Sequence, residues 1–119
     1  MDRSSQSGDQ SEPDLSKALD RLWTRFLPEI EERVNALELA ASTSLKNRLS
    51  ASDREAAHAA AHKLAGVLGT FDLKRGSDLA HELEVAFSDA QGPVRESADV
   101  VAQAVVELRA LIEGRKRGF

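Results

Sequence analysis

Apolar residues recur every three or four positions along a long stretch near the N-terminus. They are Leu15, Leu19, Leu22, Phe26, Ile30, Val34, Leu37 and Ala41. This spacing places them on one face of a helix, which turns once every 3.6 residues. Pro28 interrupts the stretch and removes one backbone hydrogen-bond donor. The pattern therefore predicts a long amphipathic helix that is either kinked at Pro28 or split there into two helices.

Three shorter segments carry the same spacing. They cover approximately residues 52–70, 74–88 and 94–113. Ser52 and Glu55 fit the Ser-x-x-Glu capping box, which favours a helix start at Ser52. Gly92 and Pro93 separate the last two segments, and Gly114 fits the residue just past a helix end. Because every connection is short, consecutive helices are expected to be antiparallel neighbours.

The expected fold class is therefore all-α, an up-down antiparallel four-helix bundle. The 119 residues suffice for one domain, which we expect to span residues 14–114. Residues 1–13 are mostly polar and are expected to form a disordered arm, because they have little apolar surface to bury. Residues 115–119 are expected to form a basic tail.

Composition excludes several functional classes. The chain has no cysteine, so disulfides and thiolate metal sites are excluded. Its net charge of -4 argues against nucleic acid as a main partner. No apolar run approaches the roughly 20 residues that span a bilayer, and the first residues do not resemble a signal peptide. We therefore expect a cytoplasmic protein with no membrane partner. We also expect a monomer, with pairing of the amphipathic helices between chains as the open alternative.

The helix expected over residues 52–70 has an unusual outward face. At about 100° per residue, His62, Gly66 and Gly69 fall opposite the core-facing Leu64 and Leu68. Each glycine inside a helix costs roughly 1 kcal/mol relative to alanine. Either the glycines permit tight packing or helix fraying, or they let another protein approach His62 closely. A neutral imidazole held outward is a nucleophile available to phosphorus.

The run Ala61–Gly66, with the sequence AHKLAG, resembles the signature of histidine-containing phosphotransfer (HPt) domains from bacterial phosphorelays. That signature reads approximately His-x-Leu-Lys-Gly, followed by an apolar-Gly pair and a helix with a Leu-x-x-Leu pattern. Here Phe71 and Asp72 stand at the pair, and Leu79 and Leu83 lie in the following helix. The helix layout of the chain is compatible with this family.

The resemblance implies that His62 is the phospho-acceptor, with Lys63 as an auxiliary charge and Gly66 as the small residue beneath the partner. It further implies a partner-docking surface that includes Ala59, Ala65, Gly66 and Gly69. Two residues depart from the family pattern: Ala65 replaces a frequent lysine, and Asp72 replaces the usual glycine. These departures bear on the efficiency of transfer and on the turn after the helix.

The resemblance also implies the partners. Members of this family carry a phosphoryl group and are not enzymes. A response-regulator receiver domain supplies the aspartyl phosphate, the acidic pocket and Mg²⁺, and a sensor histidine kinase is the other expected partner. The chain itself is expected to need no cofactor, because in-line transfer depends mainly on positioning and charge neutralisation.

Two other functions stay open at this point. His58 and His62 are four residues apart and, with His81 or Glu82 as a third ligand, they match the spacing of a metal site. Alternatively, the chain is a helical adaptor that keeps the phosphotransfer fold without its chemistry.

Overall fold

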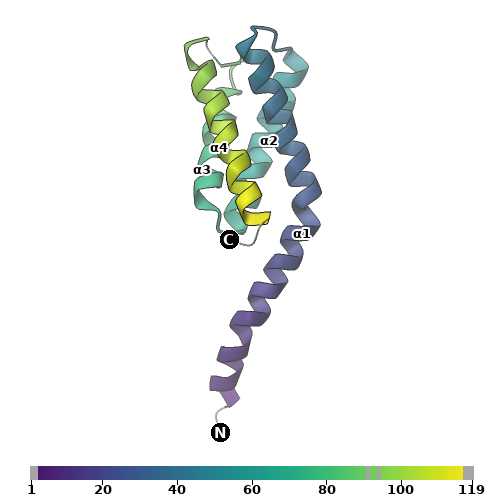
Figure 1. The fold of residues 1–119 in the computed structure, drawn as a ribbon, viewed down its shortest axis with the longest axis vertical. Coiled ribbons are helices and arrows are strands. Elements are labelled where there is room, and N and C mark those ends of the chain that lie inside the picture. The colour runs from purple at the N-terminus through teal and green to yellow at the C-terminus, as the bar shows by residue number, and fades with distance from the viewer. Residues whose placement is uncertain (1–2, 91, 94, 117–119) are drawn as a thin grey trace.

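The computed structural model describes residues 3–90, 92–93 and 95–116, and it describes side chains from Leu15 onward, except that of Arg95. Within these residues the chain forms helices and no strand. The helices are α1 (Arg3–Leu45), α2 (Ala51–Thr70), α3 (Lys74–Ala86), the short 3₁₀ helix η1 (Arg95–Ser97) and α4 (Ala98–Lys116). Consecutive long helices run in opposite directions, and the C-terminal half of α1 stands beside the other three (Figure 1). The predicted all-α four-helix bundle is confirmed.

The core follows the predicted apolar stripes. All four long helices contribute side chains with almost no exposure: Ile30, Val34 and Leu37 from α1, Leu64 and Leu68 from α2, Leu79 and Leu83 from α3, and Leu108 and Ile112 from α4. Burying one such side chain stabilises the fold by about 1.5–3 kcal/mol. The described residues include no buried polar or charged residue. The stripes therefore account for the packing of the bundle.

Helix α1 takes one of the two forms expected at Pro28, a single helix rather than two. It passes Pro28 as one continuous helix, so it is not split there. The ribbon changes direction about halfway along its length (Figure 1). Residues 3–13, expected to be a disordered arm, are drawn as a helical continuation of α1 beyond the bundle. Extending an existing helix avoids the cost of nucleation, and each added residue contributes one backbone hydrogen bond.

The start of α2 lies slightly earlier than predicted. The N-cap is Ser50, whose hydroxyl accepts a hydrogen bond from the backbone N–H of Asp53 at 3.0 Å. The prediction of a capping box at Ser52 and Glu55 was therefore wrong by two residues. Ser50 and Asp53 have the same three-residue spacing, and the acidic Asp53 suits the positive end of the helix dipole.

Two helices end at a non-glycine residue with positive φ, Asn47 after α1 and Asp72 after α2. After α2, the N–H of Leu73 donates to the carbonyl of Leu68, and the N–H of Asp72 donates to the carbonyl of Gly69. This is the Schellman pattern, in which the residue with positive φ is usually glycine. Asp72 at φ 61° therefore adopts a left-handed conformation that glycine supplies without steric cost.

The last two helices also differ from their predicted bounds. Helix α3 ends at Ala86 rather than Ser88, whose hydroxyl instead donates to the carbonyl of Val85. The predicted start of the fourth helix at Val94 lies outside the described residues, and α4 itself begins at Ala98. Gly114 does not stop α4, because it is buried inside the helix.

Two basic side chains connect the final turn of α4 to α1. Arg115 donates to Asp20 at 2.8 Å, and its guanidinium lies 5.1 Å from the centre of the Trp23 ring. Lys116 donates to Glu31, also at 2.8 Å. These two residues were expected to belong to a basic tail, but they lie within the bundle, while residues 117–119 lie outside the described part of the chain. No described helix is both long and apolar enough to cross a membrane.

Candidate functional site

His62 projects from the middle of α2 into solvent. Its side chain is 71% exposed, whereas Ala61 and Leu64 beside it in sequence are fully buried. Ala59, Gly66 and Gly69 are also exposed, as the helical spacing predicts. The ring is therefore accessible to a second protein while its helix is held by the core.

Glu84, on α3, is the direct partner of His62. The Nδ1 atom of His62 lies 2.8 Å from Oε2 of Glu84. The bond to the imidazole holds the pKa of Glu84 below its usual value, against the opposing effect of desolvation. The carboxylate is consequently ionised at neutral pH and can only accept a hydrogen bond.

This pairing selects one form of the neutral imidazole. Because the carboxylate accepts, the proton must be on Nδ1, and Nε2 keeps its lone pair. The side of the ring that carries Nε2 is then the nucleophilic side. Helical periodicity within α2 gives no sign of Glu84, which the structure adds to the site.

The glycines on the outward face differ in their surroundings. A Cβ added to Gly66 would meet no atom within 4 Å, and one added to Gly69 would meet Ser77 Oγ at 3.5 Å, an ordinary contact. Gly76 on α3 is different, because its added Cβ would lie 3.2 Å from Leu68 Cδ1. Packing within the chain therefore explains Gly76 but not Gly66. The bare surface beside His62 is open to an external group.

A shallow groove of about 530 Å³ adjoins His62 between α1 and α2. Its lining residues are Phe26, Glu29, Arg33, His62, Lys63, Gly66, Val67 and Thr70. Phe26, expected from its spacing to be a core aromatic, remains 36% exposed here. Arg33 is paired with Glu29 at 3.3 Å. The contribution of α1 could not be predicted from the sequence, because periodicity within one helix does not show which helix lies beside it.

Lys63 lies on the surface of α2, whereas Ala65 is buried. Lys63 is exposed and lines the groove, so its ammonium group is on the same side of the bundle as His62. Ala65 is only 3% exposed, and its carbonyl accepts a hydrogen bond from the hydroxyl of Ser77 at 2.7 Å. The prediction that Ala65 forms part of the docking surface was therefore wrong, because this side of α2 packs against α3.

The other two histidines lie around the same carboxylate. Nδ1 of His81 is 3.6 Å from Oε1 of Glu84. After the larger effect of His62, the charges of His58 and His81 also lower the pKa of Glu84. Among the described residues, no group of three or more His, Cys, Asp or Glu side chains has an arrangement that holds a metal ion. The alternative of a metal site at His58 and His62 therefore gains no support from the geometry.

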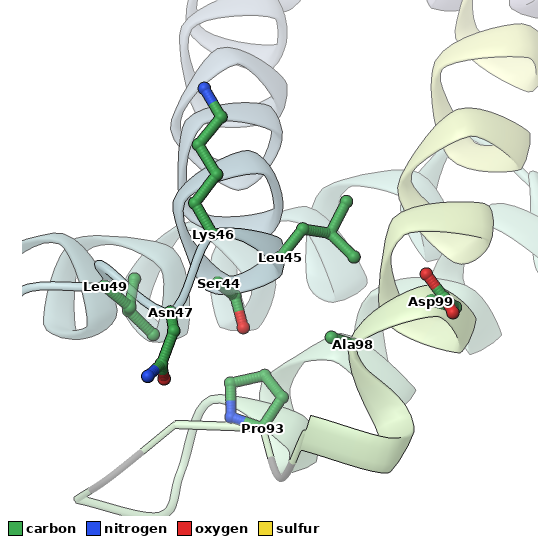
Figure 2. A pocket seen from close by; sticks show the side chains of 8 residues that line it. All are labelled: Ser44, Leu45, Lys46, Asn47, Leu49, Pro93, Ala98 and Asp99. Carbon is green, nitrogen blue, oxygen red and sulfur yellow. The ribbon is translucent and has the colours of Figure 1, made fainter.

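A second hollow, of about 350 Å³, lies between the end of α1 and the start of α4 (Figure 2). Pro93 and Ala98 border it on one side, while the side chain of Lys46 extends away from Pro93 (Figure 2). None of the predicted site residues lines this hollow. The exposed residues among those predicted for the site lie on α2 instead.

Comparisons with known proteins give one match. The sequence model of a family described as Hpt domain matches residues 21–117, which is most of the chain. No curated protein matches the chain, and no solved structure does.

Proposed function

Because this chain belongs to the Hpt domain family, whose members are phosphocarrier modules of phosphorelays and not enzymes, we propose that His62 accepts and donates the phosphoryl group. The observation that supports this most strongly is the exposed imidazole with Nδ1 bound to Glu84. In the neutral imidazole, that arrangement leaves the Nε2 lone pair free to react.

The transfer step can be written with all atoms accounted for. The Nε2 lone pair of His62 attacks phosphorus of an aspartyl phosphate on the partner. An N–P bond forms while the P–O bond to the partner's carboxylate breaks, and that carboxylate leaves with the electron pair. The partner's receiver domain supplies Mg²⁺ and the acidic pocket, so this chain contributes an aligned nucleophile.

Glu84 acts as a positioning residue in this proposal. As Nε2 bonds to phosphorus, the ring gains positive charge, and the carboxylate of Glu84 lies where it stabilises that charge through Nδ1–H. The same bond restricts rotation of the ring. When the phosphoryl group returns to a receiver, the steps are reversed and Nδ1 keeps its proton throughout.

Lys63 and Gly66 serve the approach of the partner. Gly66 leaves open space one turn after His62, which lets a surface come close to Nε2. Lys63 is the exposed cation next in sequence to His62, so it compensates for the absence of a lysine at position 65. The surface proposed for docking therefore comprises Ala59, Lys63, Gly66 and Gly69, together with the groove side chains of α1.

The proposal is tested by phosphoryl transfer from a receiver domain loaded with labelled acetyl phosphate and Mg²⁺. We expect the wild-type chain to acquire label that is labile in acid and stable in alkali. The His62→Gln variant should acquire none, while His58→Gln and His81→Gln should keep it. His62 is exposed, so its substitution should leave the circular dichroism spectrum unchanged. Label that persists in folded His62→Gln would refute His62 as the acceptor.

A further inference from the structure

The N-terminal half of α1 presents three large apolar side chains to solvent. Leu15 is 62% exposed, Leu22 is 38% exposed, and Phe26 lies at the border of the groove beside His62. They are seven and four residues apart, so they share one face of the helix. This part of α1 leads away from the other helices (Figure 1). The bundle thus leaves Leu15 and parts of Leu22 and Phe26 exposed along its own longest helix.

This face borders the side of α1 that enters the core, and Phe26 lies at the junction, because its ring packs edge-on against the core residue Phe71 with centroids 6.3 Å apart. Trp23 on the same stretch is buried, and its ring packs edge-on against Phe71 with centroids 5.3 Å apart. Trp23 follows Leu22 by one residue, which is about 100° around the helix. Contacts with the core therefore cover the side of α1 around Trp23 and one edge of Phe26, and they leave Leu15 and part of Leu22 exposed.

The apolar face is continuous with the groove at His62. Phe26 belongs to both, because it lines the groove together with His62 and Val67. At a rise of about 1.5 Å per residue, Leu15 lies about 16 Å along the helix from Phe26. A domain of about 100 residues has a radius of gyration of about 13 Å. A domain seated over His62 is therefore large enough to reach along α1 toward Leu15.

Unpaired cations border this face. Arg21 and Arg25 are exposed, and neither forms an ion pair with any residue whose side chain the structure describes. Arg33, Arg75, Arg109 and Arg115 all have carboxylate partners. Arg25 is one turn from Leu22, and Arg21 is one turn from Arg25, so both follow the same side of the helix. Positive charge here fits a partner that carries a phosphate and several carboxylates.

We propose that Leu15, Leu22 and Phe26, flanked by Arg21 and Arg25, form a second part of the docking surface for the receiver domain that exchanges the phosphoryl group with His62. The inference rests on the proposed function and adds a specificity surface to it. A receiver domain near its phosphorylated aspartate offers charge opposite to that of the two arginines. A second copy of this chain would instead bring the same two cations.

The test compares two matched double variants of α1. Leu15→Gln with Leu22→Gln alters the proposed surface, and Leu39→Gln with Leu45→Gln alters two exposed leucines at the other end of the same helix. The probe is the receiver domain, loaded with acetyl phosphate and Mg²⁺, that labels the wild-type chain fastest. We expect kcat/KM for labelling to fall about tenfold in the first variant, a loss of roughly 1.4 kcal/mol, and to stay unchanged in the second. Leu15→Gln alone, at the most exposed site, should lower it in the same direction without affecting folding.

A charge variant gives an independent readout. Arg21→Gln with Arg25→Gln should lower the association rate and weaken its dependence on salt, with little effect on the rate within the complex. Equal labelling rates in the wild type and both α1 surface variants would overturn this inference and leave His62 as acceptor. A second result would also overturn this inference. If the wild type is a dimer that Leu15→Gln with Leu22→Gln dissociates, and labelling rates are unchanged, the face binds a second copy of this chain. No label on the wild type from any receiver would overturn the proposed function itself.

Discussion

His62 and Glu84 are 22 residues apart in sequence, on either side of the turn at Leu73, and their Nδ1 and Oε2 atoms are 2.8 Å apart. In an antiparallel helical hairpin, residues equally distant from the turn lie at the same height. The connection between α2 and α3 therefore determines which acidic side chain meets the imidazole. The two helices are further fixed by the hydrogen bond from Ser77 to the carbonyl of Ala65, one turn from His62.

Replacing Glu84 should alter the imidazole before it alters the fold. In Glu84→Gln, a neutral amide oxygen still accepts from Nδ1–H, but the charge assistance is lost. We expect the transfer rate to fall about tenfold, which corresponds to about 1.4 kcal/mol in the barrier. In ¹⁵N spectra, we expect a larger fraction of His62 with its proton on Nε2.

Glu82→Gln is the matched control, because Glu82 is exposed on the same helix, whereas the described hydrogen bond and ion pair of His62 are both with Glu84. Its transfer rate and ¹⁵N spectrum should equal those of the wild type. A Glu84→Gln protein that transfers phosphate at the wild-type rate would exclude Glu84 as a positioning residue.

Substitution of Gly66 should separate stability from transfer. Both Gly66→Ala and Gly66→Leu remove an unfavourable helical glycine, and an added Cβ meets no atom within 4 Å. Each should therefore raise the free energy of unfolding by up to about 1 kcal/mol. Transfer should decrease in the order glycine, alanine, leucine, because the added atoms occupy the space left for the partner. Urea unfolding and stopped-flow labelling measure the two effects separately, and equal transfer rates across the series would contradict the role given to Gly66.

The ion pair between Glu38 and Arg109 should make stability depend on pH. Two hydrogen bonds from Arg109, at 2.9 and 3.0 Å, lower the pKa of Glu38 below its usual value of 4.5. The stabilisation is therefore complete above pH 4.5 and disappears as the pH falls through the lower pKa of the folded state. Glu38 is 42% exposed, so solvent screening limits the contribution to about 1 kcal/mol or less.

In urea unfolding experiments, Glu38→Gln should be less stable than the wild type at pH 7. The gap between the two proteins should shrink as the pH is lowered below 4.5. A difference that stayed constant down to pH 2 would show that the pairing with Arg109 is not its source.

Asp72→Gly should stabilise the turn after α2. Asp72 has φ 61°, a conformation that glycine adopts without steric cost. Relief of this strain should raise the free energy of unfolding by about 0.5–1 kcal/mol, less the larger chain entropy of glycine in the unfolded state. Asp72→Val should lower it, because a β-branched residue is strained at positive φ. Thermal unfolding of the three proteins checks the order, and a valine variant as stable as the wild type would contradict it.

Periodicity within each helix was sufficient to predict the bundle and the outward direction of His62. It failed where a neighbouring helix decides the outcome. Ala65 is close to the edge of the outward face, and only the position of α3 shows that it is buried. Likewise, nothing within α4 indicates that the helix continues past Gly114. It continues because Arg115 and Lys116 donate hydrogen bonds to Asp20 and Glu31 of α1.

The sequence did not single out Glu84. The expected helix bounds at residues 70 and 74 centre the hairpin on residue 72, which places Glu82 opposite His62. The structure centres the turn on Leu73, and this shift of one residue brings Glu84 to the imidazole instead. The groove at Phe26 was harder to predict, since it depends on the lateral packing of α1 against α2, which neither helix encodes alone.

The central claim is that phosphate bonds to Nε2 of His62 while Nδ1 keeps its proton for Glu84. It is tested most directly by ¹⁵N-edited NMR of the protein with labelled histidine, before and after incubation with a phosphorylated receiver domain. We predict a phosphorus coupling on Nε2 of His62 and a protonated Nδ1. Phosphate on Nδ1, or on any other residue, would contradict the account.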